Sequence, residues 1–161
     1  MPLKNLPNNT DTDNAERAEI IIRSHVILSM GLGLVPIPFL DTIGITGIQL
    51  AMLRKLAKIY HIPFSDHIGK SALMSLLGGT GSVPAAGIIF TTMKAVPLIG
   101  TSIAAVTMPV TVGAITHVTG KIFHQHFASG GTFLTFDPKK VRSYYYQEFS
   151  SIKEHHVQND Y

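Results

Sequence analysis

The chain has no cysteine among its 161 residues, which excludes disulfide bonds and thiolate metal ligands. It is also short of charge: charged residues make up 14% of the chain, whereas soluble domains usually carry about 25%. Hydrophobic residues make up 45%. The net charge of +3 is small and the basic residues are spread out, so nucleic-acid binding has little support. These shortages favour a chain that hides part of its surface in lipid or against a partner.

Charge is most clearly missing from the middle of the chain. No charged residue occurs in 71–93 or in 95–120, and Lys94 stands alone between them. Each half is long enough to cross a hydrocarbon layer about 30 Å thick, which takes ~20 helical residues. Both halves are rich in Gly, Ala, Ser and Thr, as expected of helices that pack closely together in a membrane. Prolines interrupt the run, so a buried hairpin of core helices in a soluble bundle is the alternative.

The first half of the chain predicts a helical hairpin. Apolar residues at spacings of three and four predict a helix from Ala15, and Gly31 and Gly33 loosen its end. A second helix is expected over 42–60, with Asp41 as its N-cap. Neither helix is comfortably long enough to span a bilayer. The pair is therefore either a re-entrant wedge or an ordinary hairpin packed on the rest.

The second half predicts further helical segments at 71–77, 85–93 and 101–127, the last of them bent near its proline. A polar connector precedes these segments, and Ser65 or Asp66 is expected to cap the first of them. Glycine- and proline-rich breaks separate them. The pattern as a whole predicts an all-α fold of helical hairpins with a membrane association.

The C-terminal part of the chain has a different character. Residues 129–131 predict a turn, and 132–136 predict a short extended piece. Asp137 is expected to cap a helix that begins with Pro138. This helix, 139–149, is amphipathic, with apolar and aromatic residues alternating with Lys, Arg and Gln. Such a helix suits a membrane interface or a place on the surface of the bundle.

The expected organisation is one helical domain over 15–150 between a polar N-terminal tail, 1–14, and a C-terminal tail, 151–161. The N-terminal residues lack the apolar core of a signal peptide. Basic residues flank both hairpins on one side, and Lys94 marks the far tip of the second. The positive-inside rule then places both termini in the cytoplasm.

Patterns that look chemical have plainer explanations. A Gly-Lys-Ser tripeptide at 69–71 resembles the end of a P-loop, but Phe64 stands where the motif requires its first glycine. His117 and His124 share a helix face, yet no Cys, Asp or Glu in 71–129 completes a metal site. No nucleophile elbow with its base and acid is present either. We therefore expect no enzyme, no cofactor and no metal centre.

Four blocks of sequence occur in a fairly specific order and spacing: VPIPFLD at 35–41, QLAM with its basic continuation at 49–60, KAVPLIGT at 94–101 and GKIFHQHFASGGT at 120–132. Together they resemble a bacterial domain family of unknown function, found in YcjF-type inner-membrane proteins and fused behind Era-type, Ras-like GTPase domains. The resemblance covers roughly residues 18–149. It implies a helical, membrane-associated module that often works beside a GTPase, and it implies no catalytic residues. A GTPase partner of this chain would be a separate protein.

Polar residues in apolar surroundings are the candidates for function: Asp41, Gln49 and Lys94. Polar groups of this kind in a membrane line a pathway or pair with one another, and an Asp41–Lys94 pair is one such arrangement. A helix cap and a loop residue are the plain alternatives for these two residues.

Small residues mark the expected helix contacts: Gly100, Ala104 and Gly113. The leading hypothesis is a non-enzymatic membrane-embedded or membrane-associated module that contacts lipid, other proteins, a second copy of itself or a separate GTPase. One alternative is an oligomeric pore or ion-conducting protein with Asp41 and Lys94 as lining charges. The other is a soluble helical scaffold or regulator of a GTPase.

Overall fold

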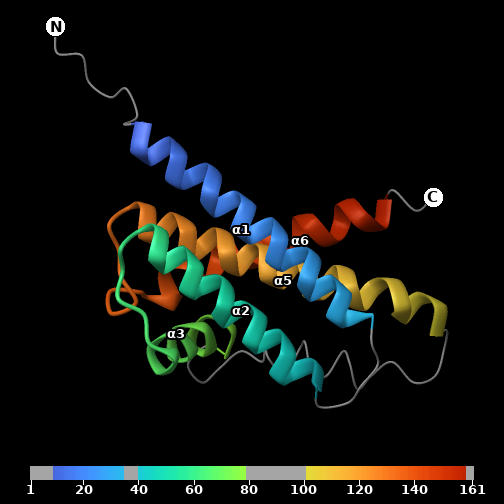
Figure 1. Cartoon of the computed structure of the whole chain (residues 1–161). Coiled ribbons are helices and arrows are strands. Elements are labelled where there is room, and N and C mark those ends of the chain that lie inside the picture. The colour runs from blue at the N-terminus through green and yellow to red at the C-terminus, as the bar shows by residue number, and fades with distance from the viewer. Residues whose placement is uncertain (1–8, 35–39, 79–100, 159–161) are drawn as a thin grey trace, which may run out of the picture.

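The computed structural model describes the backbone of residues 9–34, 40–78 and 101–158. The burial and contacts of side chains are described for 10–34, 44–77 and 108–152. Five helices and no strand occur in this described part of the chain (Figure 1). They are α1 (Asn9–Gly33), α2 (Leu40–Ile59), α3 (Asp66–Gly78), α5 (Thr101–Ala128) and α6 (Pro138–Gln158). The expected all-α class is confirmed.

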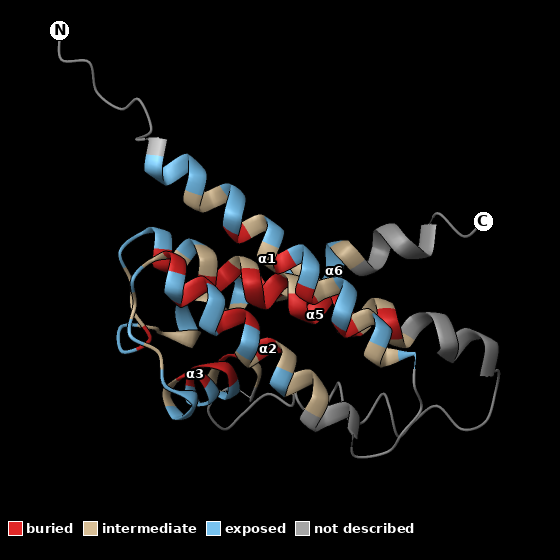
Figure 2. Ribbon diagram, viewed as in Figure 1, coloured by how far each residue is buried: buried red, intermediate tan, exposed pale blue. Residues whose placement is uncertain are grey.

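Helix α5 is the central helix of the bundle. α1, α2 and α6 pack against it, and α3 contacts both α2 and α6. α1 runs antiparallel to α2 and α5, so its last turn meets the N-terminal halves of the other two (Figure 1). Gly33 lies against Pro109 of α5, and Leu32 lies against Gly44 of α2. The buried residues follow the faces that these three helices share (Figure 2).

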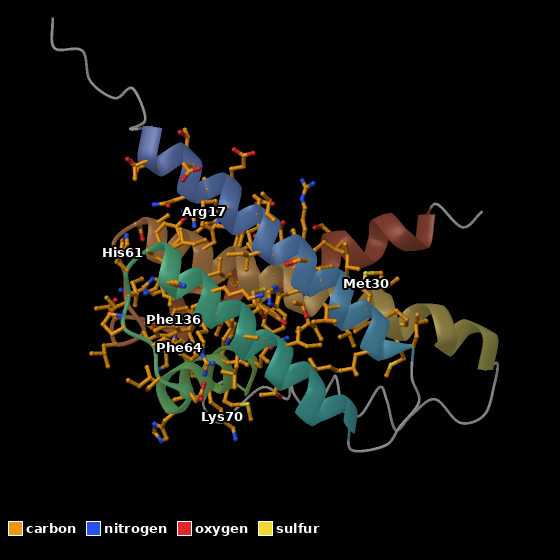
Figure 3. The ribbon with its side chains drawn as sticks, in the orientation of Figure 1. Arg17, Met30, His61, Phe64, Lys70 and Phe136 are labelled. Carbon is orange, nitrogen blue, oxygen red and sulfur yellow. The ribbon has the colours of Figure 1, made fainter. Side chains whose placement is uncertain are left out.

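Aromatic side chains fill the end of the bundle where α2 and α5 finish (Figure 3). Phe123 is fully buried, and its ring centroid lies 4.5 Å from that of Phe136. Phe127 and Phe133 meet edge to face at 5.0 Å. The ring centroid of Tyr60, just after α2, lies 6.4 Å from that of Phe127. These rings join α2, α5 and the α5–α6 loop into one core, with the favourable geometry of offset and edge-on aromatic pairs.

Three of the local signals for turns and helix starts are confirmed. The amide N–H of Ile68 donates to Ser65 Oγ at 3.3 Å, so Ser65 caps α3. The N–H of Lys139 donates to Asp137 Oδ1 at 3.0 Å, so Asp137 caps α6. Gly130 has φ of 84° in the turn after α5, a conformation in which a side chain would be strained.

The first boundary that differs from expectation is the start of α1. The helix begins at Asn9, within the segment that we expected to be a polar tail. Asp13 and Arg17 lie one turn apart with 3.8 Å between their charged atoms, and Glu19 and Arg23 form a second pair of this kind. Such pairs stabilise solvent-exposed turns that have no apolar face of their own.

The C-terminal part shows two further differences. Residues 132–136 form a turn, not an extended piece, because the N–H of Thr132 donates to Thr135 Oγ1 at 2.8 Å and the N–H of Thr135 to Thr132 O at 3.2 Å. α6 continues to Gln158, past its expected end, because Ile152 prolongs the apolar face that packs on the core.

No described helix combines the length and the apolar character needed to cross a membrane. α3 ends at Gly78, and α5 continues through Pro109 as one helix. The expected helical segment 85–93 and the turn around Lys94 lie outside the described residues. The prediction of two spanning halves is therefore not supported by the helices that the structure describes.

Candidate functional site: the charge-free end of the bundle

Charge is distributed unevenly along the three helices that form the centre of the bundle. No Asp, Glu, Lys or Arg occurs over 24–34 of α1, 44–53 of α2 or 108–120 of α5. Because α1 runs against the other two helices, these stretches meet at the same end (Figure 1). We call the three stretches together the charge-free end.

Small residues allow the helices to approach closely at this end. A Cβ atom on Gly33 would lie 3.1 Å from the Cα of Pro109, and one on Gly113 would lie 2.6 Å from Met30 Cγ. Ordinary side chains at these two positions would push the helices apart or displace their neighbours. The inside of the charge-free end is therefore closely packed, in the manner of helices that meet through small residues.

Two turns further into the bundle from Gly113, an apolar layer is formed by one residue each from α1, α2 and α5. A Cβ on Gly120 would lie 2.8 Å from Ile22 Cγ1 and 3.0 Å from Met52 Sδ. These three residues therefore mark one level of the bundle. Residues three or four positions away lie one turn closer to the charge-free end, on the same core-facing side of each helix, and at this level they are polar.

We use the name buried layer for the five buried polar residues of these three helices: His25 and Ser29 from α1, Gln49 from α2, and Thr116 and Thr119 from α5, each at most 4% exposed. Both amide atoms of Gln49 are buried without a hydrogen-bond partner, and so is Thr119 Oγ1. Leaving such groups unpaired costs roughly 1–3 kcal/mol each. The layer contains no carboxylate or ammonium group, so the core keeps the uncharged character of this end.

His25 belongs to this uncharged layer because its environment favours the neutral ring. Burial lowers the pKa of His25, the nearby Lys55 lowers it further, and a bond to the carbonyl of Ile21 opposes both. The Nδ1 atom lies 2.7 Å from Ile21 O. A carbonyl oxygen only accepts, so Nδ1 carries the proton.

The outside of α1 is apolar as well as its inside. Four aliphatic side chains, three on the helix and one directly after it, are mostly exposed: Ile20 at 60%, Ile27 at 71%, Leu28 at 57% and Leu34 at 64%. Figure 2 shows exposed residues along the side of α1 that faces away from α2 and α5. A helix that is apolar on both sides is typical of one surrounded by other apolar groups. The apolar outer side of α1 is the part of this surface that our sequence analysis missed.

The residues singled out from the sequence are only partly brought together. Gln49 lies in the buried layer, and Gly113 lies against Met30. Asp41 is in the first turn of α2, not before it as a cap, because that helix begins at Leu40.

The other candidates fall where the structure gives no side-chain surroundings. Lys94 and Gly100 lie outside the described residues. Asp41 and Ala104 lie in described helices, but the contacts of their side chains are not described. The Asp41–Lys94 pair therefore stays a prediction.

The histidines do not gather into a metal site in the described part of the chain. There, no group of three His, Cys, Asp or Glu side chains is placed to hold an ion. His124 instead stacks on Tyr60 with 5.9 Å between ring centroids, and His126 Nε2 lies 2.9 Å from the carbonyl oxygen of Thr132. Both rings have structural partners.

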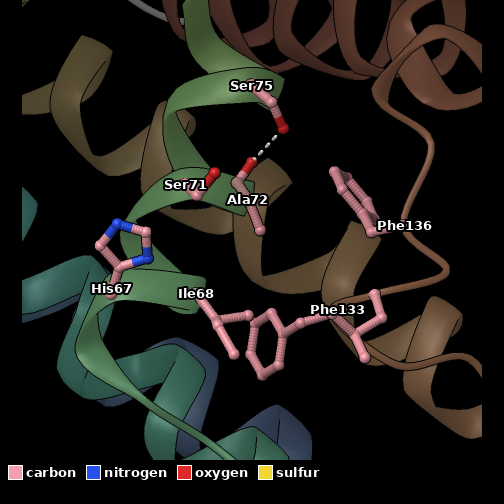
Figure 4. Close-up of a pocket in the computed structure, with 8 residues that line it drawn as sticks. His67, Ile68, Ser71, Ala72, Ser75, Phe133 and Phe136 are labelled. Carbon is pink, nitrogen blue, oxygen red and sulfur yellow. Dashed lines mark hydrogen bonds between the residues drawn. The ribbon is translucent and has the colours of Figure 1, made fainter.

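A pocket of about 360 Å³ lies on another side of the molecule, between α3 and the α5–α6 loop (Figure 4). His67, Ser71 and Ser75 lie along its α3 side, and Phe133 and Phe136 on the other. Ser75 Oγ donates to the carbonyl of Ala72 at 2.8 Å. No carboxylate is among the described residues that line this pocket, so these residues do not form the nucleophile, base and acid of a hydrolase.

The fold and this surface together define a class: a small all-α protein with a close-packed uncharged end and, in the described residues, no assembled catalytic group. The chain belongs to the family described as Domain of unknown function (DUF697), whose model matches residues 5–154. This match confirms the family resemblance that we inferred from the four sequence blocks.

Among curated proteins, Magnetosome membrane protein 22 of Magnetospirillum gryphiswaldense is 32% identical over 137 residues, which cover 84% of this chain and 70% of that protein. No solved structure matches.

Proposed function

We propose that the protein is a non-enzymatic, membrane-associated helical module whose charge-free end contacts lipid. The observation that carries this proposal is the exposure of Ile27, Leu28 and Leu34 at an end whose helices carry no charge. Fully burying an aliphatic side chain of this size is worth roughly 1.5–3 kcal/mol. Transfer of these side chains out of water would therefore favour the bound state.

Two further observations support this proposal. The curated relative is named a membrane protein, which makes a membrane a reasonable partner for this chain. The described helices are too short or too polar to cross a bilayer, and shallow contact through one end of the bundle requires no crossing helix. In our proposal the bacterial inner membrane is the site, with both chain termini on its cytoplasmic side.

Vesicle flotation tests the proposal. We expect the full chain to float with liposomes of bacterial phospholipid, and Leu28→Glu to weaken binding by about tenfold or more, since it places a charge in the apolar layer. Leu134→Glu is the matched control, because Leu134 is 86% exposed but lies in the α5–α6 loop at the other end. Equal losses for both variants, or no flotation of the unmodified chain, would show that this end does not contact lipid.

The pore and the GTPase-scaffold alternatives have less to support them. A pore was predicted from Asp41 and Lys94, and the surroundings of both side chains lie outside the described residues. A separate GTPase partner follows from the family resemblance alone. Nucleotide-dependent capture of a GTPase by the soluble chain, without vesicles, would favour the scaffold.

A further inference from the structure

A groove of about 240 Å³ lies at the charge-free end, between α1, α5 and α6. α6 runs back along α5 (Figure 1), and Ile152 of α6 reaches the groove. Five of the side chains that line it are half-exposed, so the groove is open at the surface: Val26, Met30, Val110, His117 and Ile152. The other two lining residues, Gly113 and Ala114 of α5, are buried at its base. We call this space the side groove.

The lining of the side groove is almost wholly apolar. Among the described residues that line it, His117 is the one with a nitrogen or oxygen atom in its side chain. An ordered water molecule needs several polar partners, whereas an apolar cavity of about 150 Å³ stays dry and takes up a molecule the size of benzene. The chemistry of the lining therefore favours an apolar occupant over water.

The dimensions of the side groove fit a single hydrocarbon chain. Val110 and His117 lie seven residues apart on α5, so the groove is about 10 Å long. Its volume over this length leaves a cross-section about 5 Å wide. Carbon atoms that are not bonded touch at about 3.5–4.0 Å, so one chain fits this width. A helix with its side chains is about 10–12 Å across and does not fit.

The side groove continues into the exposed apolar side of α1. Met30, near the end of α1 (Figure 3), lies one turn from Val26 inside the groove. It also lies one turn from Ile27 and, at the end of the helix, from Leu34, which are both outside the groove. No charged residue occurs over 24–34 of α1. The surface that we propose to contact lipid therefore leads into the groove without a charge between them.

The two ends of the side groove differ in polarity. Met30 and Val110 lie towards the charge-free end, whereas Val26 and His117 lie towards the middle of the bundle. Arg23 precedes Val26 by one turn, and its side chain is 79% exposed although it lies 3.8 Å from Glu19. Arg23 and Met30 are about 10 Å apart along α1, comparable to the depth that an interfacial helix reaches below the headgroups. A lipid chain in the groove can therefore keep its phosphate near a guanidinium group.

We infer that the side groove holds one acyl chain of a membrane phospholipid, with its phosphate end towards Arg23 and its methyl end towards Met30. The inference rests on the proposed function, because the bilayer that contacts the charge-free end supplies the phospholipid. Ile27 and Leu34 stay in contact with the surrounding lipid. The groove thus adds one seated lipid to that contact and replaces none of it.

Binding of a soluble amphiphile to the full chain in buffer tests the groove without a vesicle. The probe is dansyl-labelled undecanoic acid, whose emission rises when it enters an apolar site, and we expect saturable binding of one probe per chain. Val110→Trp fills the groove from α5 and is expected to weaken binding tenfold or more. Leu28→Trp is the matched control, because Leu28 is exposed at the same end but does not line the groove, and it leaves binding unchanged. Equal binding by both variants would place the probe elsewhere and overturn the inference.

Two further measurements make this test decisive. Ile152→Trp fills the groove from α6 and is expected to weaken binding as well, so the test does not depend on the folding of Val110→Trp alone. Dihexanoylphosphatidylglycerol distinguishes a phospholipid from a free fatty acid, and we expect it to displace the probe from the unmodified chain. If undecanoic acid displaces the probe and the phospholipid does not, the assigned occupant is wrong.

The two proposals fail in different measurements. A chain that floats with vesicles but binds no probe keeps the proposed function and loses the seated lipid. A chain whose probe binding depends on Val110 and Ile152 but that never floats keeps the groove as an acyl-chain site and loses the membrane contact.

Discussion

The two ends of this bundle are built in different ways. The aromatic end, with the rings around Phe123, carries two ion pairs with 2.5 Å between charged atoms, Arg54–Asp66 and Lys121–Glu148. The bond to Glu148 raises the pKa of Lys121. At the charge-free end, glycines bring the helices close together inside, while aliphatic side chains lie outside. The first end carries ion pairs at its surface, and the second end carries exposed aliphatic side chains, which our proposal places against lipid.

The largest expected effect is at the aromatic end. Phe123→Ala removes a fully buried ring that contacts three other phenylalanines, so it should lower the free energy of unfolding by about 3–5 kcal/mol. Denaturant titration measures this, with Leu134→Ala as an exposed control expected to change stability by less than about 0.5 kcal/mol. A loss below about 1 kcal/mol would mean that this end does not hold the fold together.

A comparison of two glycines tests how tightly the other end is packed. Gly120→Ala puts a methyl group 2.8 Å from Ile22 and should cost about 1–3 kcal/mol. Gly113→Ala should cost less, because the atoms it meets belong to the flexible side chain of Met30. Thermal unfolding of both variants gives the order, and a larger loss at Gly113 would contradict it.

Substitution of Gln49 should raise the stability of the protein, whereas the changes above lower it. Gln49→Met keeps the side-chain length and removes two polar atoms that have no partner, so unfolding should cost about 1–2 kcal/mol more than in the unmodified chain. Denaturation of the two proteins side by side measures the gain. A loss of stability would show that the amide makes hydrogen bonds in solution.

The smallest effect is expected from pH. Burial lowers the pKa of His25 and of His124, so both rings bind protons less readily in the folded protein than in the unfolded chain. Stability is therefore full above the unfolded value of about 6.5 and falls as the pH drops towards the folded pKa values. Melting temperatures between pH 7.5 and pH 5 measure this fall, and His25→Leu should make it shallower. If His25→Leu leaves the fall in melting temperature unchanged, other titrating groups cause that fall.

The turns and helix starts could be predicted because each depends on residues that are neighbours in the chain. Ser65 and Asp137 cap helices that begin one residue later, and Gly130 forms the turn after α5. The extent of the helices was harder to predict. The first turns of α1 hold no apolar pattern, and only the exposed pairs one turn apart, such as Asp13 and Arg17, indicate a helix there.

The exposed apolar side of α1 was missed for a different reason. α1 carries apolar residues on two opposite sides, with Ala18 and Ile22 on one and Ile20 and Ile27 on the other. Periodicity shows that both sides exist, but it does not tell which one meets the core. The heptad spacing of Ile20, Ile27 and Leu34 was the available signal.

The sequence by itself determined the all-α class, the family, the Ser65 and Asp137 caps and the presence of long stretches without charge, because these properties are local or additive along the chain. Only the tertiary structure decided that the uncharged parts of α1, α2 and α5 meet at one end, that Gln49 is buried without a partner, and that Ile27 remains exposed. Each of these depends on contacts between residues far apart in the sequence. The antiparallel packing of α1 on α5 determines these contacts, and no single segment contains that information.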